Sequence, residues 1–188
     1  MNPIAEVTKH LQFGAAHFLV NHEWDVAKNR AAFHACSLYK DDEGTIQEPH
    51  GHTYHLEVTV RGEIDEGTGF VIDFKDLKRI LEDGIVKRMD HRLLNNIEYF
   101  QKTKKSPTVE NILHYIWGEI CMQIDELRPG LAWLQQVKVW ETPNSFGILT
   151  KELAGIKEEV PVKMGGHVPS LIGTDYSLGD NFAKSVKR

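Results

Sequence analysis

The chain of 188 residues contains only two cysteines, Cys36 and Cys121. Two thiols cannot form the disulfide framework of a small secreted domain, so we expect free cysteines and a cytoplasmic protein. Positive charge is also in short supply, because 27 acidic residues outnumber 22 Lys and Arg residues and leave a net charge of -5. This balance argues against a general nucleic-acid-binding protein.

Long apolar runs are missing as well. The first residues contain no signal-peptide core, and no segment reaches the uncharged apolar length that crosses a bilayer, so we expect no membrane association. The length fits one domain, which we place at residues 1–154, followed by a Gly-, Ser- and Lys-rich C-terminal extension at 155–188.

Paired histidines open an alternating segment that runs from His50 to Gly62. In an extended strand, side chains alternate between two faces, so His50 and His52 share the apolar face while His55 points away from it. The other members of that face are Tyr54, Leu56, Val58 and Val60. Neutral imidazole is a common zinc ligand, and a catalytic zinc ion typically takes three protein ligands.

A third imidazole ends another expected strand, at residues 7–18. There, Leu11, Phe13 and Ala15 share a face with His17. A single histidine on an apolar face is usually a core residue whose hydrogen bonds are satisfied within the protein. For each of the three histidines taken singly, this alternative stays open. Two strands that both end their apolar face in histidine favour a metal site made of His17, His50 and His52.

The rest of the chain predicts two helices and two more strands. Asp73 is a good N-cap for a helix with the apolar stripe Phe74, Leu77, Leu81, Ile85 and Met89. A second helix starts at Ser106-Pro107-Thr108, buries Cys121 and stops at Arg128-Pro129-Gly130. Strands are expected at 136–142 and 146–150, whereas 20–49 and 92–105 look irregular. The resulting order ββααββ indicates an α+β fold.

Two further polar features stand out. Glu141 shares a strand face with Val137 and Val139, so its carboxylate needs a partner, either an internal Arg or Lys or a ligand that offers two adjacent N–H groups. Asp90 precedes His91 at a helix end, where the pair either transfers protons or simply caps the helix. The sequence leaves both choices open.

A cupin-type metal site is the competing hypothesis. Gly44, the triplet His50-Gly51-His52 and Glu57 match most of a first cupin motif. No second cupin motif follows, and two amphipathic helices argue against an all-β jelly roll. An amidohydrolase, which also uses paired strand histidines, would need a much longer barrel.

Six motifs in order closely resemble the 6-pyruvoyltetrahydropterin synthase and 6-carboxytetrahydropterin synthase family over about residues 7 to 151. They are Phe13-Gly14-Ala15-Ala16-His17, His50-Gly51-His52-Thr53-Tyr54, Gly69-Phe70-Val71-Ile72-Asp73-Phe74, Met89-Asp90-His91-Arg92-Leu93-Leu94-Asn95, Pro107-Thr108-Val109-Glu110-Asn111 and Trp140-Glu141-Thr142. The resemblance implies the tunnelling fold, a four-stranded antiparallel sheet with two helices on one face. It also implies that subunits join their sheets into a barrel, commonly in a homohexamer.

The resemblance also implies roles for individual residues. His17, His50 and His52 match the zinc ligands, and Glu141 matches the carboxylate that anchors the pterin ring. Thr108 and Glu110 lie in the motif that lines the pterin pocket, and Asp90 and His91 match the proton relay. The implied substrate is the small molecule 7,8-dihydroneopterin triphosphate, for whose phosphates Lys28, Arg30 and Arg92 are candidate partners.

The chain departs from the family pattern at the catalytic base. The family places a cysteine a few residues before His-Gly-His, but here the nearest one is Cys36, and thirteen residues separate it from His50. A loop of that length can fold back at modest entropic cost, so we favour Cys36 as a displaced base. Glu48 or Glu43 is the alternative, and a lost base is another.

For the reaction, we favour 6-carboxytetrahydropterin synthase, a carbon–carbon lyase of queuosine (deazapurine) biosynthesis that releases acetaldehyde and triphosphate. One alternative is 6-pyruvoyltetrahydropterin synthase, a carbon–oxygen lyase that eliminates triphosphate and keeps the side chain. The other is a non-catalytic paralogue that binds pterin or zinc.

Overall fold

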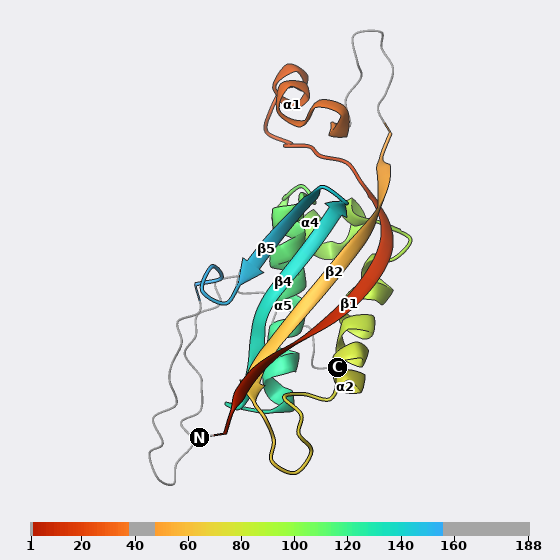
Figure 1. Cartoon of the computed structure of the whole chain (residues 1–188). Helices are drawn as coiled ribbons and strands as arrows, with labels where there is room; N and C mark the ends of the chain where they lie inside the picture. The colour runs from red at the N-terminus through yellow and green to blue at the C-terminus, as the bar shows by residue number, and fades with distance from the viewer. Residues whose placement is uncertain (1, 38–47, 156–188) are drawn as a thin grey trace. The chain divides into compact units, whose positions relative to one another are not determined.

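The computed structural model of the protein describes residues 2–37 and 48–155, and a β-sheet of five strands forms its frame. Figure 1 shows the long strands of this sheet side by side. The strand order is β3-β1-β2-β4-β5. The strands are β1 (Ile4–His17), β2 (His50–Glu63), β3 (Arg92–Leu93), β4 (Ala132–Thr142) and β5 (Ser145–Thr150). The four longer strands pair antiparallel, as expected, whereas the two-residue β3 pairs parallel with β1. The expected count of four strands was therefore one too low, because two residues carry no periodicity.

The long β1–β2 ladder sets which side chains share a face. Phe13 pairs with Tyr54, and His17 pairs with His50 at the far end. Phe13, Tyr54, Val58 and their neighbours on this face are buried, which confirms the alternation expected for both strands.

Two helical segments cover that face of the sheet (Figure 1). α2 (Phe74–Leu81) begins at the N-cap Asp73, and α5 (Val109–Leu127) begins at the N-cap Thr108. Helix α5 comes so close to β5 that a Cβ atom on Gly147 would lie 2.7 Å from Leu113 Cδ1. Cys121 on α5 is buried in the core, as the sequence predicts.

Helix α2 continues through a π-helical turn, η2 (Glu82–Val86), into α3 (Lys87–Met89). The stripe residues Leu77, Leu81, Ile85 and Met89 are fully buried. Phe74 was expected in the same stripe, but it is 48% exposed because it occupies the first helical position, at the rim of the layer.

Both segments expected to be irregular contain short helices. Residues 20–49 include α1 (Val26–Phe33) and the 3-10 turn η1 (His34–Cys36), and residues 92–105 include β3, η3 (Leu94–Asn96) and α4 (Glu98–Thr103). α1 lacks an apolar stripe and is held by the buried amide of Asn29, which bonds to the backbone of Asn21, Trp24 and Asp25. An apolar periodicity therefore could not reveal this helix.

None of the helices in the described part of the chain is long and apolar enough to cross a membrane. The extension expected at 155–188 lies outside the described residues apart from Gly155, as does Glu43.

Candidate metal centre

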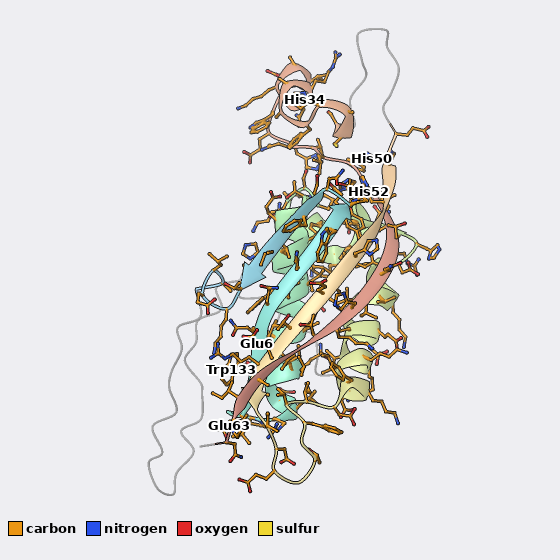
Figure 2. The ribbon with its side chains drawn as sticks, viewed as in Figure 1. Glu6, His34, His50, His52, Glu63 and Trp133 are labelled. Atoms are coloured by element: carbon orange, nitrogen blue, oxygen red, sulfur yellow. The ribbon has the colours of Figure 1, made fainter. Side chains whose placement is uncertain are left out.

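Three imidazoles converge where β1 and β2 end together. One ring nitrogen from each of His17, His50 and His52 lies within 4.8 Å of the other two. The ladder produces this cluster directly, since His17 faces His50 across the strands and His52 follows two residues later on the same side. Figure 2 shows His50 and His52 at the end of the sheet nearest α1.

The ring of His17 is held in one orientation. Its side chain is 1% exposed, and its Nδ1 lies 2.8 Å from the carbonyl oxygen of Pro107. A carbonyl only accepts hydrogen bonds, so Nδ1 carries the hydrogen and Nε2 keeps a free lone pair. This Nε2 lies 3.1 Å from Nε2 of His50.

Burial favours neutral rings in the cluster. It lowers the pKa of His17, and it also lowers the pKa of His50, with the neighbouring His52 adding to the effect. A metal ion requires the neutral form of imidazole. Nε2 of His52 is buried without a hydrogen-bond partner among the described residues, which is costly unless a further group binds it. The three convergent imidazole nitrogens therefore fit a divalent metal ion such as zinc.

Glu141, on β4, supplies a carboxylate beside the imidazoles. Its Oε1 lies 3.4 Å from His17 Nε2 and 4.0 Å from His52 Nε2. Val137 and Val139 on the same strand face are fully buried, as the parity predicts. The side chain of Glu141 is 24% exposed, so one side of the carboxylate remains open to an incoming molecule.

The segment after β1 returns Cys36 to the same region. The amide of Leu19 donates to the Cys36 carbonyl at 2.8 Å, and Leu19 pairs with Ser37. This places Cys36 beside the chain two residues beyond His17. Burial raises the pKa of the Cys36 thiol, and the negative charge of the Glu141 carboxylate raises it further. The two groups therefore interact electrostatically. Glu48, the alternative base, is solvent-exposed in the structure.

Asp90 and His91 form a hydrogen-bonded pair on the outer side of β1. Nδ1 of His91 lies 2.7 Å from Oδ2 of Asp90, and Oδ1 of Asp90 accepts from the Gly14 amide at 2.8 Å. The Gly14 amide and then His91 hold the pKa of Asp90 below its ordinary value. The side chain of His91 is 88% exposed, so its imidazole faces solvent rather than the core. The backbone of His91 is in the left-handed region, with φ +56°.

The other expected site residues lie on three further elements. Thr108 caps α5 directly after Pro107, and Glu110 is exposed in the first turn. Lys28 on α1 lies over the ring of Trp24 at 4.3 Å, and Arg92 is exposed on β3 beside β1. Sequence reasoning missed the Pro107 carbonyl as a partner of His17, because a backbone acceptor leaves no side-chain signal.

The fold and the site together define a class of protein: an α+β domain with a three-histidine cluster at a strand end and a carboxylate beside it. The family model described as 6-pyruvoyl tetrahydropterin synthase matches residues 6–152. The chain belongs to this family.

Curated relatives carry three different names. A Drosophila melanogaster protein named 6-pyruvoyl tetrahydrobiopterin synthase is 38% identical over 145 residues, which cover 77% of this chain and 78% of the relative. A Pyrococcus furiosus protein named dihydroneopterin monophosphate aldolase is 42% identical over 119 residues, or 63% of this chain and 90% of the relative. A Bacillus subtilis protein named 6-carboxy-5,6,7,8-tetrahydropterin synthase is 27% identical over 153 residues, or 80% and 88%.

Among solved structures, the Caenorhabditis elegans 6-pyruvoyl tetrahydropterin synthase superposes with a TM-score of 0.65 at 28% identity. The match covers 79% of this chain and 96% of the nematode chain. The α+β architecture expected from the sequence is thus confirmed.

Proposed function

We propose that this protein is a zinc-dependent lyase acting on 7,8-dihydroneopterin triphosphate. The observation that carries the proposal is the set of three convergent imidazole nitrogens within 4.8 Å of one another. Three nitrogen ligands leave a coordination position for substrate, which is the arrangement of a catalytic rather than a structural zinc site.

His17, His50 and His52 would hold the metal, and bound zinc supplies a Lewis acid that polarises a substrate oxygen and acidifies the neighbouring C–H bond. The carboxylate of Glu141 accepts two N–H donors from the pterin edge and so orients the ring. We assign Thr108 and Glu110, at the start of α5, to the lining of the pterin pocket.

Proton transfer falls to two groups of the chain. We assign the base to Cys36, which is tied to the segment that follows His17. Burial and then the carboxylate of Glu141 raise the pKa of Cys36, so pterin N–H groups bound to that carboxylate would weaken its effect and favour the thiolate. Asp90 orients His91 through their 2.7 Å contact, and His91 returns the proton.

For the product, we propose 6-carboxy-5,6,7,8-tetrahydropterin, with release of acetaldehyde and triphosphate in queuosine biosynthesis. This is a carbon–carbon cleavage, and two of the relatives have names that fit it, the carboxy synthase and the aldolase. The second candidate is elimination of triphosphate to a 6-pyruvoyl product, favoured by the 38% identical Drosophila relative.

We also propose a cytoplasmic homohexamer in which neighbouring subunits pair their sheet edges. Strand β5 forms one edge of the sheet, and β1 is paired on its outer side over Ala15 and Ala16. Light scattering of the purified full chain measures the subunit number.

Lys28, Arg30 and Arg92 are the proposed partners of the triphosphate.

The test is incubation of zinc-loaded protein with 7,8-dihydroneopterin triphosphate, followed by analysis of pterins and of trapped aldehydes. We expect acetaldehyde from the wild type and a loss of at least about 100-fold in kcat for Cys36→Ala, as for removal of a general base. Cys121→Ala, at a buried thiol in the core, is the matched control.

Other outcomes point elsewhere. Triphosphate without any aldehyde identifies the pyruvoyl reaction, and a different aldehyde identifies an aldolase. Equal turnover by wild type and Cys36→Ala transfers the base to Glu48 or Glu43. Zinc and pterin binding without product would make the protein a non-catalytic paralogue.

A further inference from the structure

Two side chains from the segment that precedes α5 form hydrogen bonds with the backbone just after His17. Asn95 Oδ1 accepts from the Phe18 amide at 3.0 Å, while Asn95 Nδ2 donates to the Phe18 carbonyl at 2.9 Å. Ser106 Oγ accepts from the Val20 amide at 2.7 Å and donates to the Val20 carbonyl at 2.6 Å. Each side chain thus satisfies both backbone groups of one residue, as a neighbouring strand would.

Ser106 is itself held in place. Its carbonyl accepts from Asn111 Nδ2 at 2.8 Å and from the Thr108 amide at 2.8 Å, which ties it to the first turn of α5. Ser106 therefore connects the rigid start of α5 to the chain that leaves β1. Pro107 is buried between Ser106 and the N-cap Thr108, so its carbonyl belongs to the peptide unit that leads directly into α5.

This carbonyl is the one that meets Nδ1 of His17 at 2.8 Å. The contact requires Nδ1–H and directs the lone pair of Nε2 toward His50 and Glu141. Hydrogen bonds from a second layer of residues commonly set the tautomer and the ring angle of a metal-binding histidine. A small shift of the chain on either side would lengthen the contact and release the ring.

We infer that Asn95 and Ser106 are positioning residues for His17: they clamp the backbone after β1 against the loop before α5, so that the Pro107 carbonyl fixes the Nδ1–H tautomer and the direction of Nε2. The inference rests on the proposed metal centre, in which His17 is a ligand. Asn95 and Asn111 end two of the sequence motifs, and these contacts give both asparagines a role.

The first measurement needs neither metal nor substrate. Two-bond 1H–15N correlation spectra of the full chain with 15N-labelled histidine report which ring nitrogen carries the hydrogen, and His17→Gln identifies the signal. We expect Nδ1–H for His17 in the wild type, and a mixture of tautomers in Asn95→Ala and Ser106→Ala.

The second measurement is zinc affinity by competition with a chromophoric chelator. We expect each alanine variant to bind zinc about 10- to 100-fold more weakly than the wild type, the usual effect of losing an outer-shell contact. Ser106→Thr keeps the hydroxyl and should keep the affinity. Ile124→Val, a core truncation near the C-terminal end of α5, controls for a general loss of stability.

An Nε2–H tautomer in the wild type would overturn the inference, and so would wild-type zinc affinity in both alanine variants. Failure of the lyase proposal is distinguishable, because neither readout depends on turnover. A protein with the expected tautomer and zinc affinities but no product would refute the reaction while supporting the positioning role.

Discussion

At the scale of single residues, Glu141 carries the strongest functional expectation. Its carboxylate lies beside His17 and His52 on a strand whose preceding inward side chains are the buried Val137 and Val139. Glu141→Gln replaces one acceptor oxygen with a donor, so it cannot accept two N–H groups from a pterin edge. We expect kcat/KM to fall by about 100-fold or more, because the new amide N–H would face an N–H group of the pterin and leave both without an acceptor. Zinc affinity should be retained, because the three imidazoles are unchanged.

Steady-state kinetics together with chelator competition measure both quantities. Glu57→Gln is the control, because Glu57 lies on the opposite face of the sheet beside His10. Unchanged kinetics in Glu141→Gln would exclude Glu141 as the pterin anchor.

Glu119 on α5 predicts a pH effect on stability. Its side chain is 9% exposed, and burial raises its pKa although Arg88 opposes the shift. A raised pKa means that the folded protein binds the carboxyl proton of Glu119 more tightly than the unfolded chain does. Below the ordinary pKa of about 4.3 the carboxyl is protonated in both states, so its burial as a charged group costs no stability there. Stability is lost as the pH rises from there through the raised folded pKa.

Glu119→Gln removes this titration. The free energy of unfolding of the variant, relative to that of the wild type, should therefore increase with pH across that range and become constant above it. Urea unfolding between pH 4 and 7 measures the difference, with the exposed Glu126→Gln on the same helix as control. A difference that does not vary with pH would contradict the prediction.

At the scale of elements, the approach of α5 to β5 depends on Gly147. A Cβ atom there would lie 2.7 Å from Leu113 Cδ1 and 2.9 Å from Val109 Cγ1. Gly147→Ala should therefore destabilise the fold by about 1–3 kcal/mol through overpacking. Gly84→Ala makes only ordinary contacts at 3.7 Å and lies in a helical turn, so it should be neutral or slightly stabilising. Denaturant unfolding of the two variants tests the contrast, and equal stabilities would refute it.

At the scale of the whole molecule, the proposed metal centre links β1 to β2 and to the loop before α5 through His17, His50 and Pro107. A ligand that binds only the folded state stabilises it by about 2.7 kcal/mol at 100 times its Kd. We expect zinc to raise the melting temperature and a chelator to reverse the rise. Calorimetry of His52→Ala, which keeps the fold but loses one ligand, should show no zinc-dependent shift; an undiminished shift would place the ion elsewhere.

The sequence alone predicted most of each long strand, the faces of their side chains and which three histidines end the apolar faces, because strand alternation is a local property. It missed the first four residues of β4, at 132–135, and the pairing of β1 with β2 was needed to bring the histidines together. The N-cap Asp73 was predictable because a cap is also a local signal, and the expected helix start at Ser106-Pro107-Thr108 contains the observed N-cap Thr108. Only the tertiary structure decided what depends on contacts between distant segments. The helix α1 is held by one buried asparagine, β3 is defined by two pairings with β1, and the Pro107 carbonyl orients His17 across 90 residues of chain. The return of Cys36 to the end of β1 belongs to the same group, since a backbone hydrogen bond to Leu19 places it there.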